Sequence, residues 1–352
     1  MIRLLIAAGV AMVVSLFGTT ILIKLLKHLK IGQPIRDDSP ESHSKKAGTP
    51  TMGGIAVVAA ATLGYIVSDF FGGIYTESGI IVMLTIIGAA AVGLVDDWLK
   101  VRANYNRGLN KKMKMTGLLI VSVGFAVAMS ELTTVQTTLS FTRFNYPGIE
   151  LGQIGWSIWA ILLIIASTNA VNLTDGLDGL AAGAGIFCYA AFVIIGLWQF
   201  DHYESYKVFA ALDLAIIAAA MVGGIVGFLW WNTAPAQIFM GDTGALAIGS
   251  GLAALSLATN TQLLLAIVGG LFVLETISVI LQISSFHWFG RRIFNMTPLH
   301  HHFEIRGWPE TTVIVRFWIF SGMCVAVGLG LFYADAIASG VLDVATSRAS
   351  SG

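Results

Sequence analysis

Apolar stretches recur along the whole 352-residue chain and constrain its fold more than any other feature. Ten of them are about 16 to 24 residues long, close to the roughly 20 residues with which a helix crosses the hydrocarbon core. Only 11% of the residues are charged, whereas a soluble domain carries about 25%. The sequence therefore predicts an all-α integral membrane protein with about ten transmembrane helices. The expected spans are 4–23, 52–71, 79–95, 116–131, 154–171, 179–198, 208–230, 244–259, 262–285 and 312–334.

One polytopic membrane domain is expected over residues 1–335, and a polar, disordered tail over 336–352. The segment between the fourth and fifth spans, 132–153, is the longest one on its side of the membrane. Its stretch Thr138-Leu-Ser-Phe-Thr-Arg-Phe144 alternates polar and apolar residues, and Asn145-Tyr-Pro-Gly148 follows as a turn signal. A small outer β-hairpin is predicted there.

The distribution of lysine and arginine predicts the orientation in the membrane. Segments 24–51, 96–115 and 286–311 hold 15 of the 20 basic residues. With ten spans these segments fall on one side, which must be cytoplasmic by the positive-inside rule. Both termini then lie outside the cytoplasm. The formal net charge is zero, so no general attraction to nucleic acid is expected.

The densest polar cluster within the apolar sequence is Asn169-Ala-Val-Asn-Leu-Thr-Asp-Gly-Leu-Asp-Gly179. It brings two carboxylates, Asp175 and Asp178, and two carboxamides, Asn169 and Asn172, to the junction of two spans. Polar groups at the edge of the hydrocarbon are costly and usually functional. A tight turn with one capping aspartate is the alternative, but such a turn needs one of these residues and not four.

A pair of adjacent carboxylates, Asp96 and Asp97, ends the third span. Neighbouring carboxylates repel each other and persist beside a cation, either a metal ion or lysine. The alternative is a hydrated helix end. The lysines available for neutralisation are Lys100, Lys111, Lys112 and Lys114.

Two further segments on the same side carry polar residues beside glycines. Lys45-Lys-Ala-Gly-Thr-Pro-Thr-Met-Gly-Gly54 places two lysines before a turn and a helix start, which suits an anion, although for this segment taken alone a positive-inside anchor followed by a helix breaker is favoured. In the segment 230–244, Asp242 lies between Gly241 and Gly244, either as a helix cap or near a ligand. Asn232 and Phe239 offer a carboxamide and a flat ring that suit a nucleobase.

The last polar segment is Met296-Thr-Pro-Leu-His-His-His-Phe-Glu304. Successive residues of a helix are about 100° apart, so His300, His301 and His302 cannot share one face. A zinc site is therefore not expected, and a surface for a sugar or phosphate is favoured over a chance histidine run. Glu275, inside the ninth span, has no assigned role beyond the general expectation of an inward-facing, paired or protonated carboxyl.

Acidic side chains, lysines and asparagines on one membrane face match the needs of a magnesium–diphosphate site. Mg²⁺ binds one or two carboxylates together with phosphate oxygens and water. Phosphoryl transfer then depends mainly on positioning and charge neutralisation.

The five segments, in this order and spacing over about residues 32–317, closely resemble the phospho-N-acetylmuramoyl-pentapeptide transferase family. This family belongs to the polyprenyl-phosphate sugar-1-phosphate transferases. The histidine motif favours it over the N-acetylglucosamine branch. The resemblance implies ten transmembrane helices, a homodimer, dependence on Mg²⁺ and a cytoplasm-facing cleft. It also implies transfer from UDP-N-acetylmuramoyl-pentapeptide to the membrane lipid undecaprenyl phosphate, giving lipid I and UMP.

The resemblance also implies residue roles. Asp242 corresponds to the magnesium ligand, and it is expected to be catalytic together with Asp96 and Asp97. The residues expected to bind substrate are Lys46, Thr51, Lys112, Asn169, Asn172, Asp175, Asp178, Asn232, Phe239, His300, His301 and His302.

Two alternatives remain at this stage. A transporter would hold its coupling residues near the bilayer midplane, and only Glu275 among the acids of interest lies well inside a span. An N-acetylglucosamine-1-phosphate transferase would share the chemistry, and only the histidine motif argues against it.

Overall fold

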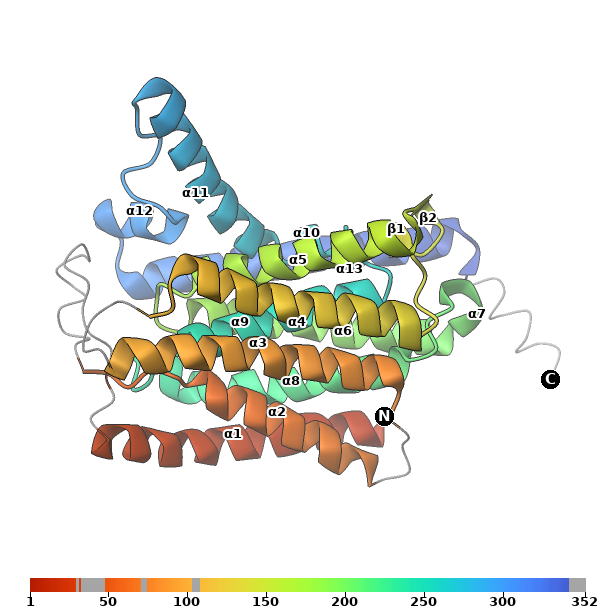
Figure 1. The fold of residues 1–352 in the computed structure, drawn as a ribbon, viewed down its shortest axis with the longest axis horizontal. Coiled ribbons are helices and arrows are strands. Elements are labelled where there is room, and N and C mark those ends of the chain that lie inside the picture. Colours follow the sequence, from red (N-terminus) through yellow and green to blue (C-terminus); the bar gives the residue numbers. More distant parts are fainter. Residues whose placement is uncertain (30–31, 33–47, 71–74, 103–107, 342–352) are drawn as a thin grey trace.

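The computed structural model describes residues 1–29, 32, 48–70, 75–102 and 108–341. Figure 1 shows long helices packed side by side in a bundle, with a small hairpin at one end and one helix leaning outward. The longer elements are α1 (Ile2–His28), α2 (Gly54–Asp69), α3 (Glu77–Arg102), α4 (Lys111–Leu132), β1 (Thr138–Arg143), β2 (Tyr146–Glu150), α5 (Gly152–Thr174), α6 (Leu180–Asp201), α8 (Ala211–Asn232), α9 (Gly241–Ala258), α11 (Gly270–Phe289) and α13 (Glu310–Ala338). Short helices are α7 (Tyr203–Tyr206), α10 (Leu265–Val268) and α12 (Leu299–Ile305).

The prediction of an all-helical membrane protein is confirmed. Eight helices of the described chain are long and apolar enough to cross a membrane: α1, α3, α4, α5, α6, α8, α11 and α13. The other two expected spans are α2, with 16 residues, and α9, with 18. Both run inside the same bundle (Figure 1).

Helix α9 forms the centre of the bundle, and every residue from Asp242 to Ala258 is buried. Helices α2, α3 and α5 pack against it. Its sequence is rich in glycine, alanine and serine, which allow neighbouring backbones to approach closely in a membrane bundle.

The predicted hairpin is confirmed. Strands β1 and β2 pair antiparallel, although the turn lies at Phe144 and Asn145, before the proline and glycine of the turn signal. Two side chains hold the hairpin to the bundle: Arg143 forms an ion pair with Asp335 of α13 at 2.7 Å, and Gln262 accepts a hydrogen bond from the Ser140 amide. The chain begins at the same end (Figure 1). We call this the hairpin end, and the opposite end the motif end.

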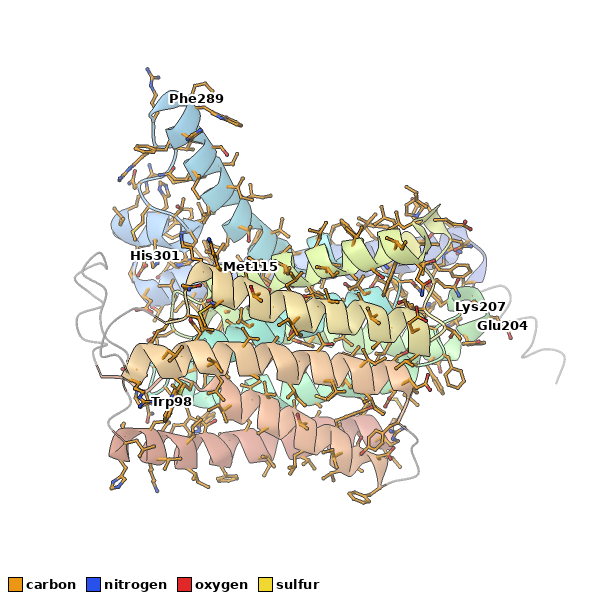
Figure 2. The ribbon with its side chains drawn as sticks, viewed as in Figure 1. Trp98, Met115, Glu204, Lys207, Phe289 and His301 are labelled. Carbon is orange, nitrogen blue, oxygen red and sulfur yellow. The ribbon has the colours of Figure 1, made fainter. Side chains whose placement is uncertain are left out.

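Three helix boundaries differ from expectation for identifiable reasons. Helix α4 begins at Lys111 because the Asn110 side chain caps it by accepting a hydrogen bond from the Met113 amide at 2.7 Å. The expected span 262–285 is divided into α10 and α11 at the adjacent glycines Gly269 and Gly270. Beyond this break α11 leans away from the bundle and ends at Phe289 (Figure 2). Helix α13 continues to Ala338, and residues 342–352 of the predicted tail lie outside the described residues.

Candidate active site at the motif end

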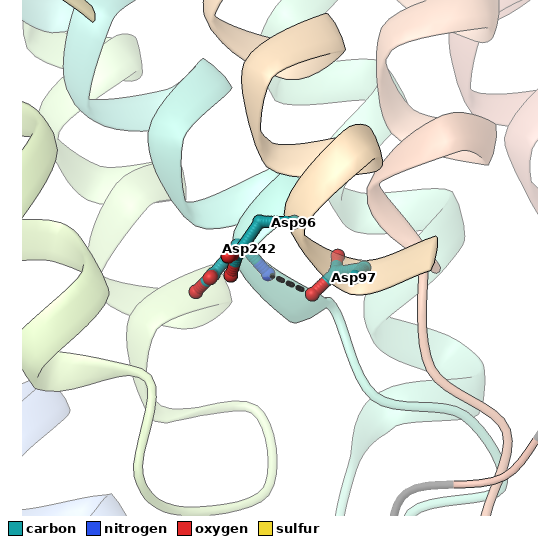
Figure 3. A group of neighbouring side chains, drawn as sticks. All are labelled: Asp96, Asp97 and Asp242. Atoms are coloured by element: carbon teal, nitrogen blue, oxygen red, sulfur yellow. Dashed lines mark hydrogen bonds between the residues drawn. The ribbon is translucent and has the colours of Figure 1, made fainter. Parts of the chain in front are cut away.

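Three aspartates meet at the motif end (Figure 3). Asp96 and Asp97 lie near the end of α3, and Asp242 lies in the first turn of α9. One carboxylate oxygen of each lies within 4.8 Å of those of the other two, and all three side chains are buried. Buried like charges at this separation require cations or protons.

Two lysines supply positive charge to this cluster. The Nζ atoms of Lys100 and Lys114 each lie 2.7 Å from Oδ2 of Asp242. Lys100, one helical turn after Asp96, also lies 2.6 Å from Oδ2 of that residue. Lys114 comes from the first turn of α4. The cluster is therefore an ionic network built from three separate helices.

Asp97 has a structural partner for both of its oxygens. Its Oδ1 accepts a hydrogen bond from the Asp242 amide at 3.1 Å (Figure 3). Its Oδ2 accepts from the Thr243 amide at 3.0 Å and from the Thr243 hydroxyl at 2.7 Å. Asp97 thus satisfies amides at the positive start of α9, as a capping side chain would. It fixes Asp242 in place.

Asp242 is the carboxylate best suited to exchange its partners. Its ion pairs are to the ammonium groups of Lys100 and Lys114, which sit on flexible stems and can change partner. Asp96 is more constrained, because its Oδ1 also accepts a hydrogen bond from the Leu109 amide at 2.7 Å. A set of donors made up of carboxylate oxygens alone fits a hard divalent cation. Asp96, Asp97 and Asp242 together could therefore hold a metal ion, and their oxygen donors are of the kind that Mg²⁺ accepts.

Glycines allow the backbones around the cluster to meet. A Cβ atom on Gly93 of α3 would overlap the backbone of Asp242, and one on Gly54 of α2 would overlap the backbone of Gly244. Gly241 has φ of +71°, and a Cβ there would overlap the Asp97 carboxylate. The close approach of α2 and α3 to the start of α9 thus depends on residues without side chains.

A second acidic element, the acidic loop of residues 175–179, lies between α5 and α6. Burial and the negative charges of Asp242 and Asp97 raise the pKa of Asp175 well above its usual range. The loop therefore lies near Asp242 and Asp97. A cation bound to them would lower the pKa of Asp175 again.

Asp178 anchors the acidic loop. Its amide donates to Glu310 of α13 at 3.2 Å, and its carboxylate accepts from the Ala236 amide at 2.9 Å. Ala236 belongs to the segment 233–240 that leads into α9. Asp178 therefore ties three elements together at the motif end.

The segment 233–240 is also held to the start of α2. The Phe239 amide donates to the Pro50 carbonyl at 2.8 Å, and the Gly53 amide donates to the Phe239 carbonyl at 2.9 Å. Asn232 bonds the Ile238 carbonyl through Nδ2 at 2.9 Å. Thr51 is buried beside Gly241. Segments far apart in the sequence thus converge on Asp242.

Comparisons with known proteins agree with this geometry. Residues 79–260 match the model for glycosyl transferase family 4, and residues 46–58 match a phospho-N-acetylmuramoyl-pentapeptide-transferase signature. Curated proteins named phospho-N-acetylmuramoyl-pentapeptide-transferase cover nearly the whole chain. The one from Streptomyces griseus is 46% identical over 94% of this chain and 98% of its own. The one from Frankia alni is 46% identical over 96% and 98%.

The chain belongs to the phospho-N-acetylmuramoyl-pentapeptide transferase family. The resemblance seen in the motifs is therefore confirmed, and the chain is a multi-pass membrane protein of a bacterial transferase family. The match to the glycosyl transferase model covers the three aspartates and the acidic loop.

Most residues singled out from the sequence lie at the motif end with the family signature. Thr51, Asp175, Asp178, Asn232 and Phe239 make the contacts at the motif end that are described above. Lys46 lies outside the described residues. Asn169 and Asn172, in the last turns of α5, are half-buried, and the Asn169 side chain donates to the Ile165 carbonyl at 2.7 Å.

Two of the four lysines expected from the sequence to neutralise the carboxylates, Lys100 and Lys114, do so in the structure. Lys112 is exposed and forms no ion pair within the described part of the chain, whereas Lys100 and Lys114 contact Asp242 directly. The signal for Lys100 was its spacing of four residues from Asp96. The sequence alone did not distinguish Lys114 from Lys111 and Lys112, because which of the three faces Asp242 depends on how α4 is rotated in the bundle.

The three histidines point to different partners, as the helical rotation predicted. His300 is buried against Glu275 at 3.1 Å. His301 lies 2.6 Å from Glu304. His302 accepts a hydrogen bond from the Asn295 amide at 3.0 Å. The three histidines lie in the short helix α12. Glu275 is paired with His300, as expected for a carboxyl within a span.

Proposed function

We propose that the protein transfers phospho-N-acetylmuramoyl-pentapeptide from its UDP-linked form to undecaprenyl phosphate. A phosphate oxygen of the lipid attacks the sugar-linked phosphorus of the donor. The bond from that phosphorus to the bridging oxygen breaks, UMP leaves, and lipid I is the product. Membership of the transferase family, together with three buried aspartates beside two lysines, supports this reaction.

We assign Mg²⁺ to the three aspartates, with Asp242 as its main ligand. The cation would neutralise charge on the donor diphosphate. Lys100 and Lys114, freed from Asp242, are suited to contact the same phosphates. Asp97 holds the first turn of α9 in place, and Asp96 is the base that keeps or takes the last proton of the acceptor phosphate.

We assign the remaining motif residues to the donor. Phe239 and Asn232 suit the uracil ring and its polar edge, as do Asn169 and Asn172 from α5. Lys46, Thr51 and Lys112 are assigned to the phosphates and ribose. Asp175 and Asp178 in the acidic loop complete the nucleotide region, and His300, His301 and His302 form the sugar side.

We further propose that the motif end faces the cytoplasm of a bacterial inner membrane, that both termini face outward, and that the protein is a homodimer. The concentration of basic residues at the motif end supports the orientation. A soluble UDP-linked donor is available on that side only, whereas the lipid acceptor reaches the site from the bilayer.

The test is release of UMP by the purified protein with Mg²⁺, polyprenyl phosphate and either UDP-N-acetylmuramoyl-pentapeptide or UDP-N-acetylglucosamine. We expect UMP and a lipid-linked diphospho-sugar from the first donor only. Equal turnover of the second donor would assign the protein to the other sugar branch. Absence of UMP with both donors, from a folded sample, would reject the proposed reaction.

A further inference from the structure

Glu275 is a fully buried carboxyl that lies away from the three aspartates, on α11. It accepts hydrogen bonds from the Leu299 amide at 2.6 Å and from the His300 amide at 3.3 Å. Its Oε1 also lies 3.1 Å from Nδ1 of His300. One carboxyl therefore holds both the first turn of α12 and the ring of the first histidine in the motif.

His300 contacts Glu275 with one ring nitrogen and lies against the acidic loop with the other. When Nδ1 donates its proton to Glu275, Nε2 of the neutral ring is the acceptor nitrogen. This Nε2 is buried and has no hydrogen-bond partner among the described residues. A Cβ atom on Gly176 would overlap it. The ring is therefore pressed against the backbone of the acidic loop, between Asp175 and Asp178.

We propose that Glu275 is a positioning residue for the transferase: through His300 it sets the place of the acidic loop relative to the three aspartates. Asp175 follows the last turn of α5, and Asp178 holds the segment that leads to Asp242. A small shift at Gly176 would therefore move both carboxylates. The expected effect on turnover rests on the proposed function, whereas the effect on the position of the acidic loop can be measured without activity.

The arrangement differs from a pair that only stabilises the fold. Glu275 makes three hydrogen bonds to two residues of α12, Leu299 and His300. Removal of a purely stabilising pair would lower thermal stability and leave the acidic loop unchanged. Removal of a positioning pair would change the position of the acidic loop and the apparent affinity for the donor in a protein that remains folded.

Amide hydrogen exchange of the peptide over residues 172–180, in detergent and without substrate, tests the structural part. Glu275→Ala and His300→Ala should each raise its exchange by about tenfold, and the double variant should raise it no further, because the two residues act in one chain of contacts. Gly176→Ala should raise it likewise in the wild-type background, and much less beside His300→Ala. The matched control is Glu204→Gln, an exposed carboxylate at the hairpin end, which should leave the peptide unchanged.

Kinetics test the functional part. Glu275→Ala should raise KM for the UDP-linked donor about tenfold, with a smaller fall in kcat. Glu275→Gln should recover most of this loss, because its amide oxygen can still accept the proton of Nδ1, and this milder variant serves if Glu275→Ala does not fold. Unchanged exchange of residues 172–180 in a folded Glu275 variant, or additive effects in the double variant, would overturn the inference. A wild-type protein that releases no UMP would reject the proposed reaction and leave the exchange result standing.

Discussion

Lys114 offers the sharpest perturbation of the ionic network, because a matched control lies two residues away. Its Nζ is 2.7 Å from Oδ2 of Asp242, and its side chain is 20% exposed. Lys112, on the same first turn of α4, is exposed and forms no ion pair in the described chain. Lys114→Ala and Lys112→Ala therefore remove the same chemical group with and without its contact.

The expected loss of stability in Lys114→Ala follows from its contact with Asp242. A hydrogen bond to a charged group contributes about 1.5–3 kcal/mol, whereas an exposed substitution without contacts changes stability by about 0.5 kcal/mol or less. Lys100 remains on Asp242 in the Lys114→Ala variant, so the larger penalty of about 3–5 kcal/mol for an uncompensated buried charge is not expected. We therefore expect Lys114→Ala to lose about 1.5–3 kcal/mol without metal.

The assay is thermal unfolding in detergent with EDTA and with excess Mg²⁺. In EDTA, Lys114→Ala should unfold several degrees below the Lys112→Ala control. In Mg²⁺ the difference should shrink, because a divalent cation bound to the aspartates replaces the missing positive charge and stabilises the folded state. Equal unfolding temperatures of the two variants in EDTA, or a difference that Mg²⁺ leaves unchanged, would refute the reasoning.

Three further predictions concern the same end of the bundle. Asp96→Asn should lose about a hundred- to ten-thousandfold in rate near pH 6. The loss should be smaller at higher pH, because the lipid phosphate, with a second pKa of about 6, then loses its proton unaided. A pH–rate profile parallel to that of the wild type would show that Asp96 is not the base. Gly93→Ala should cost about 1–3 kcal/mol, whereas Gly124→Ala, with no atom near its Cβ, should cost nothing. A cysteine at Lys112 should be labelled from the cytoplasmic side of intact cells only, and labelling from outside would invert the proposed topology.

Much of the fold could be predicted because apolar length and helix formation are coupled in a bilayer. The backbone of a spanning segment must satisfy its own hydrogen bonds, so a long apolar run implies a helix. The break between α10 and α11 was hidden by the same rule. Glycine is common in membrane helices, so the sequence does not mark Gly269 and Gly270 as the place where α10 ends and α11 begins.

The sequence predicted which residues form the candidate site but not the role of each one. Asp96, Asp97 and Asp242 stood out as carboxylates at helix ends, yet nothing in the sequence separated Asp97, which caps α9, from Asp242, whose partners are lysines. The link from Glu275 through His300 to Gly176 joins three distant segments. Sequence spacing carries no information about such contacts, because tertiary packing creates them.

Metal binding at Asp242 is the central claim, and Mn²⁺ titration followed by electron paramagnetic resonance tests it most directly. The wild-type protein should bind one Mn²⁺ per chain in the presence of UMP, and Mg²⁺ should compete. Asp242→Asn should abolish this binding while the protein stays folded. The control is Glu77→Gln, an exposed carboxylate at the start of α3, which should bind as wild type does. Undiminished Mn²⁺ binding by Asp242→Asn would contradict the account.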